Sequence, residues 1–158
     1  SDNFGLASNI VSGINEIFIK YEKVIVLEDD LICHPEFLSY MNDALVFYEN
    51  NDKVMTINGY NYPVNVHNLP DTYFLQQISS WGWGTWKKSW KKITFDNKFI
   101  ISQFNKKLIN DFNLNGSYNY WSHFKINYNN VKHTWAIYWY IAVFLNNGLR
   151  SRLVNKRF

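Results

Sequence analysis

Val24-Ile25-Val26-Leu27, followed directly by Glu28-Asp29-Asp30, is the stretch that decides the fold class. Four aliphatic residues in succession, without polar alternation, are typical of a strand buried on both faces, as in the sheets of α/β proteins. The three acids then lie at the carboxyl end of that strand, which is the edge of an open α/β sheet where ligands bind. We therefore expect an α/β fold with a ligand site at this edge.

The three adjacent carboxylates repel one another unless a cation or hydrogen-bond donors compensate them. We favour a divalent metal, because magnesium and manganese bind carboxylate oxygens and share their remaining ligand positions with water and substrate phosphates. The acids thus indicate a substrate that carries a nucleoside diphosphate. The alternative is structural: they precede a helix expected to begin near Pro35, and negative charge there suits the helix dipole.

Hydrophobic periodicity and turn residues predict helices and short strands along the whole chain. A helix that leads into a strand is half of an α/β repeat, so we expect an earlier strand before residue 1. Residues 1–158 suit a single domain, incomplete at its N-terminus. The expected helices cover residues 6–21, 35–50, 99–112, 117–128 and 134–145, and the expected strands cover residues 24–27, 54–59 and 73–78, with a further short strand in the last ten residues.

A second unusual stretch runs from Ser79 to Trp86 and alternates tryptophan with glycine. Glycine lets the backbone approach a ligand closely, and large flat rings beside it can form the walls of a pocket. We expect Trp81 and Trp83 to flank such a pocket. The alternative is that these tryptophans belong to the core, because buried tryptophan is common.

The overall composition excludes fewer classes of function than the positions of individual residues do. Aromatic residues make up 19% of the chain, which fits a bulky core, a sugar-stacking surface or a membrane-facing patch. The formal charge of +3 is too small to indicate nucleic-acid binding. Two basic clusters could face anionic lipid or phosphate, although solvated helix faces are the favoured interpretation. These clusters are Lys87, Lys88, Lys91 and Lys92, and Arg150, Arg152, Lys156 and Arg157.

Cysteine usage and hydropathy bear on localisation. Cys33 is the single cysteine, so the chain forms no intramolecular disulfide, which fits a reducing compartment. No stretch reaches the roughly 20 apolar residues of a membrane span, and the first residues do not resemble a signal peptide. We expect a cytoplasmic protein, with peripheral association at the inner face of the membrane compatible with the basic clusters.

The order of these motifs resembles that of the bacterial family-2-like glycosyltransferases, which have the GT-A fold. The acidic triplet is also similar to the Glu-Asp-Asp motif of the N-acetylglucosaminyltransferase I family. The resemblance implies a GT-A-like, Rossmann-like mixed sheet flanked by helices, and it covers most of the 158 residues. The segments that carry it are Asn3 to Ala7, Val24 to Asp30, Trp81 to Trp86, Thr134 to Ile137 and Asn147 to Leu149.

The resemblance also implies roles for individual residues. Asp30, the last acid of the triplet, would bind the divalent metal, manganese or magnesium, and Asp29 and Glu28 would contact ribose or sugar hydroxyls. Trp81, Gly82 and Trp83 match the segment that lines the donor sugar and the acceptor side of the site. The metal would act as a Lewis acid on the diphosphate of the leaving nucleotide.

The candidate catalytic base departs from the family pattern. Related proteins carry an Asp just before the Ser/Thr-Trp of the late helix, whereas this chain has Lys132-His133-Thr134. His133 is the expected replacement, because an unperturbed pKa of roughly 6.5 suits proton transfer near neutrality. The alternative is that His133 is an ordinary surface or capping residue. The strands that bind the nucleobase in the family would lie before Ser1.

The sequence therefore predicts a metal-dependent glycosyltransferase that moves a sugar from a nucleotide-sugar donor to a glycan or other hydroxyl acceptor in polysaccharide biosynthesis. The alternative is a non-catalytic carbohydrate-binding or relic fragment that retains the aromatic surface without the nucleotide-binding half. A nucleic-acid partner is not expected.

Overall fold

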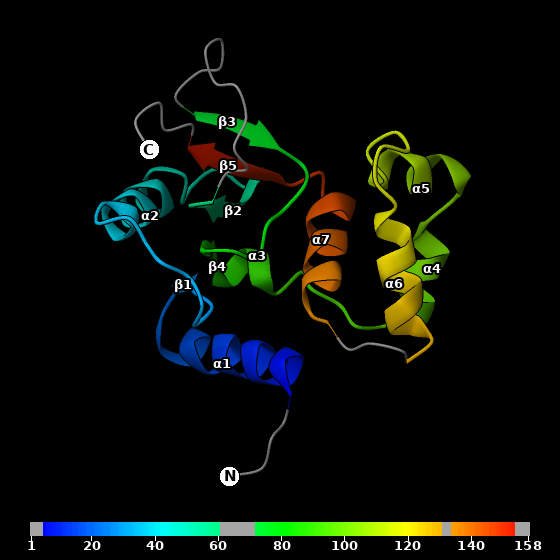
Figure 1. Cartoon of the computed structure of the whole chain (residues 1–158), viewed down its shortest axis with the longest axis horizontal. Helices are drawn as coiled ribbons and strands as arrows, with labels where there is room; N and C mark the ends of the chain where they lie inside the picture. Colours follow the sequence, from blue (N-terminus) through cyan, green and yellow to red (C-terminus); the bar gives the residue numbers. More distant parts are fainter. Residues whose placement is uncertain (1–4, 61–71, 131–133, 154–158) are drawn as a thin grey trace.

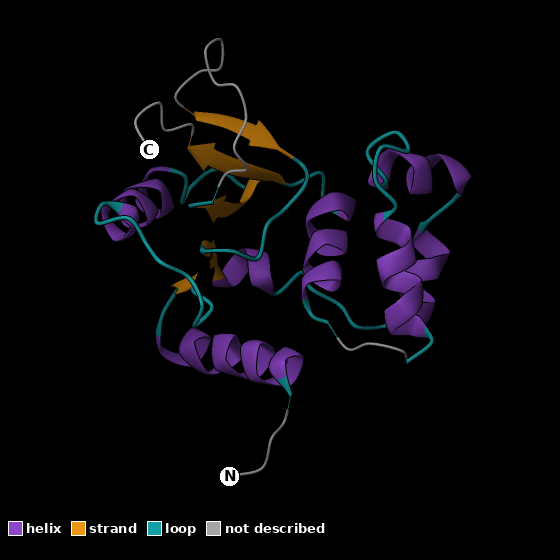
Figure 2. Cartoon of the chain, in the orientation of Figure 1, coloured by secondary structure: helices purple, strands orange, loops and turns teal. Residues whose placement is uncertain are grey.

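The computed structural model describes residues 5–60, 72–130 and 134–153, which form a mixed α/β structure (Figures 1 and 2). Helices surround a five-stranded sheet, which confirms the predicted α/β class. The helices are α1 (Leu6–Lys20), α2 (Phe37–Phe47), α3 (Lys87–Trp90), α4 (Asn97–Gln103), α5 (Lys106–Phe112), α6 (Tyr120–Tyr128) and α7 (Ala136–Leu145). The strands are β1 (Lys23–Val26), β2 (Val54–Asn58), β3 (Thr72–Leu75), β4 (Trp83–Trp86) and β5 (Leu149–Leu153).

The sheet has the strand order β1-β4-β2-β5-β3 and is mixed. Strand β4 pairs antiparallel with both β1 and β2, so these two strands run in the same direction. Strand β5 pairs parallel with β2 and antiparallel with β3. The carboxyl ends of β1 and β2 therefore meet on one side of the sheet, next to the residues that precede β4.

Strand β1 differs from the expectation of a strand buried on both faces. Val26 is buried, but Lys23, Val24 and Ile25 are only half-buried. Among the described strands β1 pairs with β4 alone, so it is an edge strand of this sheet. Its position at the edge explains why its aliphatic side chains keep some contact with solvent.

Strand β4 connects two hydrophobic clusters through its alternating side chains. Trp83 packs with Ile14 and Phe18 of α1 and with residues of α7. Trp86 packs in a second cluster beneath α2, with Met41 and Leu45. Each face of the sheet is thereby covered by helix, which is the layered arrangement expected of an α/β protein.

Helix α7 is buried along nearly its whole length, as its apolar run predicts. It lies between the sheet and helices α4 to α6 (Figure 1), so apolar side chains are required on both of its sides. Asn147 ends the helix in the left-handed conformation, with φ 48°, and the Gly148 N–H donates to Val143 O at 2.7 Å. The predicted left-handed stop at Asn147-Gly148 is thus confirmed.

Two expected helix boundaries are wrong, and in both places an asparagine cap begins a new helix. The single helix predicted over residues 99–112 is two helices, since the Asn105 side chain accepts a hydrogen bond from Leu108 N and begins α5. The helix predicted from residue 117 begins at Tyr120, where Asn119 accepts from Ser122 N. In both places the side chain satisfies an N–H group that has no partner within the helix.

Two glycines give a test of this packing. A β-carbon on Gly148 would lie 2.8 Å from Met55 Cγ and 3.0 Å from Val143 O, whereas one on Gly13, in the exposed middle of α1, would meet nothing within 4 Å. We expect Gly148→Ala to lower the free energy of unfolding by about 1–3 kcal/mol through overpacking. Gly13→Ala should raise it by about 1 kcal/mol through helix propensity. Urea unfolding of both variants measures the two effects, and equal stability of the two variants would contradict the described packing around Gly148.

Candidate functional site

The candidate site forms where three chain segments meet at one edge of the sheet. Trp83, the first residue of β4, pairs with Val26 of β1 and with Asn58 of β2. The segments that extend beyond these strands therefore come together, and Gly59 N donates a hydrogen bond to Gly82 O at 2.8 Å. The acids that follow β1 and the Trp81-Gly82 segment that precedes β4 thus share this edge.

Phe37 at the start of α2 fixes this edge by packing against two glycines. A β-carbon on Gly59 would lie 2.7 Å from Phe37 Cδ2, and one on Gly82 would lie 3.0 Å from Phe37 Cε2 and 3.6 Å from Leu27 Cδ2. Gly82 also has φ 58°, a backbone conformation that glycine adopts without a steric penalty. A side chain at position 82 would therefore be strained and would crowd Phe37. Gly82 also lies close to the side chain of Leu27, the residue that directly precedes the acidic triplet.

The acidic triplet forms a turn with Glu28 half-buried and Asp29 and Asp30 exposed. Leu31 N donates to Glu28 O at 3.3 Å and closes the turn. Burial raises the pKa of Glu28, and the nearby charges of Asp30 and Asp29 raise it further. Among the described residues none of the three carboxylates forms an ion pair. Their negative charge is therefore not balanced by a lysine or arginine in the described part of the chain.

The alternative that the acids serve the helix dipole is weakened by where α2 begins. Helix α2 starts at Phe37, two residues later than expected, and it has no acid in its first turn. The acidic triplet lies in a separate turn, and residues 31–34 have no regular structure between them. The dipole effect falls off within the first turn of a helix, so it offers the triplet little stabilisation.

Trp81 and Trp83 lie in different environments, although only Gly82 separates them. The Trp81 side chain is 41% exposed and packs edge-on against Tyr60, with ring centroids 4.8 Å apart. Trp83 is fully buried and stacks on Trp135, with centroids 5.1 Å apart. The expectation that the Trp83 ring flanks a pocket is therefore not met, because the strand directs that ring into the core against α7. Trp81 does line a pocket.

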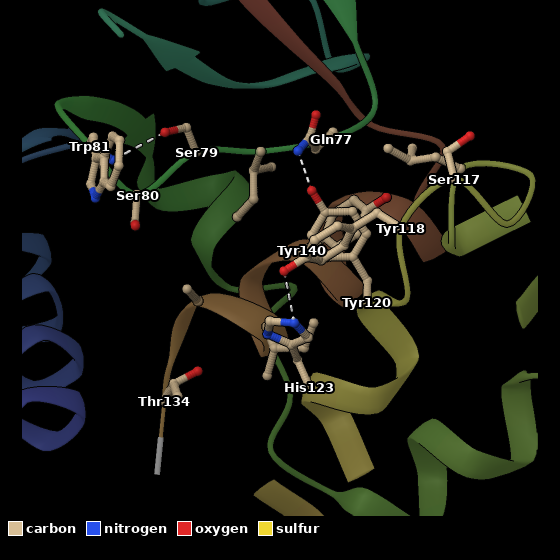
Figure 3. Close-up of a pocket in the computed structure, with 14 residues that line it drawn as sticks. Gln77, Ser79, Ser80, Trp81, Ser117, Tyr118, Tyr120, His123, Thr134 and Tyr140 are labelled. Carbon is tan, nitrogen blue, oxygen red and sulfur yellow. Dashed lines mark hydrogen bonds between the residues drawn. The ribbon is translucent and has the colours of Figure 1, made fainter. Parts of the chain in front are cut away.

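That pocket is a cavity of about 570 Å³ between the segment after β3, the loop before α6 and the start of α7 (Figure 3). Trp81 is at one end of it, and Tyr118, Tyr120 and His123 lie toward the other. The Tyr118 hydroxyl and His123 Nε2 are 3.1 Å apart, and Gln77 Nε2 donates to the Tyr120 hydroxyl. Sequence reasoning missed the residues from the α6 region, because tyrosines and a histidine at a helix start form no distinctive motif.

Asn58 links the acidic edge to the cavity wall. This fully buried side chain donates through Nδ2 to Ser79 O at 2.7 Å, which fixes the segment that carries Ser79, Ser80 and Trp81. Its Oδ1 atom is buried and accepts no hydrogen bond from a described residue. The buried Nε1 atoms of Trp83 and Trp139 likewise have no partner among the described residues.

The remaining predicted site residues and charged clusters are placed as follows. His133 lies outside the described residues, while Thr134, which follows it, lines the cavity. Lys87 pairs with Glu22 at 3.1 Å and Lys88 with Asp52 at 2.6 Å, so half of the first basic cluster is engaged in ion pairs. The side chains of the C-terminal basic cluster lie outside the described part of the structure.

Within residues 5–60, 72–130 and 134–153, no group of three or more His, Cys, Asp or Glu side chains could hold a metal ion. In the same part of the chain, no helix has the length and apolar character needed to cross a membrane.

Comparisons of the chain with protein-family models, with curated proteins and with solved structures find no match. The functional interpretation therefore depends on the geometry of the site itself.

The raised pKa of Glu28 predicts a pH-dependent effect on stability. A carboxyl whose pKa is higher in the folded state than in the unfolded chain binds its proton more tightly when folded, so its contribution to stability falls as the pH rises through that interval. We expect Glu28→Gln to raise the free energy of unfolding at pH 7. The gain should shrink as the pH falls through the folded pKa and disappear below the ordinary value of 4.5.

Urea unfolding at pH 7, 5.5 and 4 measures this difference. Glu16→Gln, at an exposed position on α1, is the control and should change the stability little at any of these pH values. A loss of stability in Glu28→Gln at pH 7 would show that the Glu28 carboxylate is compensated in the folded protein.

Proposed function

We propose that this chain is the catalytic part of a divalent-metal-dependent glycosyltransferase, which transfers a sugar from a nucleotide-sugar donor to a hydroxyl of a glycan acceptor. The observation that supports this function is the position of the acidic triplet at the sheet edge that it shares with Gly82 and the aromatic cavity. The triplet offers hard oxygen ligands, and the adjoining surface offers a glycine backbone and an exposed tryptophan ring.

The donor atoms at the acidic edge fit a metal that is shared with its substrate. Carboxylate oxygens suit magnesium and manganese, which commonly take one or two protein carboxylates together with substrate phosphates and water. Within the described residues the three carboxylates do not form a group that could hold a metal ion by themselves, so the proposal needs substrate phosphates and water to complete the metal's ligands. Asp30, exposed at the end of the turn, would hold the metal. When bound, the metal supplies positive charge to the diphosphate that leaves.

The neighbouring residues would bind the donor. Glu28 and Asp29 would accept hydrogen bonds from ribose or sugar hydroxyls, and a ring at Trp81 beside the bare backbone of Gly82 would contact the sugar. Trp83 would not contact the donor. Its buried ring packs against α7 and would contribute only by holding β4 in place. The mixed sheet, in which antiparallel β4 lies between two parallel strands, supports a GT-A-like fold.

Transfer with inversion needs a base for the acceptor hydroxyl. His133 remains the proposed base, since it precedes Thr134, a residue that lines the cavity. Cytoplasmic localisation, and peripheral association of the basic clusters with the inner face of the membrane, belong to the same proposal.

The test of the metal site is isothermal titration calorimetry with UDP, GDP, CDP and dTDP, with and without manganese. We expect one of these nucleotides to bind only in the presence of manganese, and Asp30→Asn to weaken that binding at least tenfold, because removing a metal-binding carboxylate removes a charged ligand. Asp43→Asn, at an exposed position on α2, is the matched control and should bind like the original protein.

Three outcomes would overturn the proposed function. These are nucleotide binding that needs no metal, metal-dependent binding that Asp30→Asn leaves unchanged, and failure of all four nucleotides to bind a chain extended at its N-terminus by the expected nucleobase-binding strands.

A further inference from the structure

The aromatic cavity has the chemistry of a site for an uncharged polyol. Its described lining contains no Asp, Glu, Lys or Arg side chain. Its polar groups are amide, hydroxyl and imidazole, each of which exchanges hydrogen bonds with sugar hydroxyls. They are Gln77, Ser79, Ser80, Ser117, His123 and Thr134, together with the hydroxyls of Tyr118 and Tyr120. We propose that this cavity binds the acceptor as a neutral glycan, an inference that rests on the proposed function only in naming this glycan as the acceptor.

Backbone conformation and hydrogen bonds hold the wall of the cavity that carries Tyr118 in place. Leu114, Asn115 and Gly116 all have positive φ, of 53°, 56° and 83°, and turn the chain sharply after α5. The turn is closed by Tyr118 N donating to Asn113 O at 3.1 Å. Asn113 Oδ1 in turn accepts from Trp121 N at 2.8 Å. The loop is thus tied to the start of α6, and Ser117 and Tyr118 are among the residues that line the cavity (Figure 3).

Hydrogen bonds also hold the opposite wall of the cavity in place. Gln77 donates to the Tyr120 hydroxyl, which connects the segment after β3 to α6. The Asn58 side chain fixes the position of Ser79 by donating a hydrogen bond to the Ser79 carbonyl oxygen. Tyr140 of α7 forms part of the base, and its hydroxyl donates to Phe112 O at 3.0 Å. A pocket whose walls are tied by hydrogen bonds loses little conformational entropy when a ligand binds.

Polarity and charge together select the ligand class. An apolar ligand would remove the hydroxyls of Ser80, Ser117 and Thr134 from water without replacing those hydrogen bonds, which costs free energy for each group. An anionic ligand would find no lysine or arginine in the described lining to pair with. A neutral polyol satisfies the polar groups, and its apolar ring face can lie on Trp81 and Tyr118, which are 41% and 49% exposed. The volume also lies within the range of about 300–1,000 Å³ typical of small-molecule sites.

The angles between the aromatic rings of the cavity do not suit a nucleobase as the ligand. Tyr118 and Tyr120 pack on each other at an interplanar angle of 50°, with centroids 4.5 Å apart, so no parallel slot is left between them. Tyr118 and His123 are also tilted, at 45°. A planar base is held best between parallel rings, whereas a sugar needs only one face to stack and many groups around its rim.

The position of the cavity suits an acceptor. Trp81 lines it, and Gly82, the next residue, lies against Leu27, which directly precedes the acidic triplet. One short segment therefore connects the charged edge proposed for the donor diphosphate to the uncharged cavity. The two ligands of a sugar transfer would then meet across Trp81-Gly82.

The test is a ligand-observed NMR titration of the protein with neutral trisaccharides built from glucose, galactose or N-acetylglucosamine, with glucuronate-containing analogues of each, and with uridine, all without metal. We expect a neutral trisaccharide to bind more tightly than its acidic analogue. Tyr118→Ala should weaken that binding at least about tenfold, because it removes a stacked ring and the hydrogen bond it carries. Tyr118→Phe, which keeps the ring, should lose less. His123→Ala should also weaken binding.

Tyr128→Ala is the matched control, since this tyrosine on α6 is 47% exposed and does not line the cavity. Its binding should equal that of the original protein, and thermal unfolding shows whether the Tyr118 variants remain folded. Absence of binding to every neutral glycan, preference for the acidic analogues, or uridine binding that Tyr118→Ala abolishes would overturn the proposal.

The outcome is separable from that of the proposed function. Asp30→Asn should leave glycan binding intact, and Tyr118→Ala should leave manganese-dependent nucleotide binding intact. Nucleotide binding without glycan binding would refute the cavity assignment alone. Glycan binding without nucleotide binding would refute the transferase and retain the cavity as the site of a carbohydrate-binding domain.

Discussion

The placement of antiparallel strand β4 between β1 and β2 determines the rest of this structure. Buried hydroxyls reinforce its pairing with β2, because Thr85 Oγ1 donates to Met55 O at 2.7 Å and Thr56 Oγ1 donates to Gly84 O at 3.0 Å. Gly84 leaves room for helix α2, since a β-carbon there would lie 3.1 Å from the side chains of Leu45 and Met41. With β4 fixed in this way, the residues before it must lie beside the end of β1, which brings the acidic triplet and the tryptophan segment together.

The same placement brings together in space two kinds of surface that come from distant parts of the chain. On the β1 side of Gly82 lie three carboxylates that no described cation neutralises, and on the other side lies a cavity lined by hydroxyl, amide and aromatic groups. A reaction between a charged, phosphorylated donor and a neutral acceptor needs both environments next to each other.

The sequence was most informative where local chemistry alone determines structure. The apolar run before Glu28 predicted a strand, the continuous apolar run of α7 predicted a buried helix, and Asn147-Gly148 predicted its end, because each depends on neighbouring residues only. The cavity could not be predicted in the same way. Its walls come from residues 77–81, 114–123 and 134–140, and what brings Gln77 to Tyr120 is tertiary packing. The helix starts at Asn105 and Asn119 could be predicted only in part. Asparagine is a recognised helix cap, but it is so frequent in this chain that its presence alone does not locate a helix start.

The described aromatic residues include buried core residues and exposed residues, which composition could not distinguish. Trp83, Trp90, Trp135 and Trp139 form one buried cluster between the sheet and α7, with centroid separations of 5.1–6.5 Å, and they account for part of the excess as core. Trp81 and Tyr118 remain exposed at the cavity. The division between Trp81 and Trp83 follows from Gly82, whose positive φ ends the strand alternation one residue before β4. A single glycine therefore assigns one tryptophan to folding and leaves the other available to a ligand.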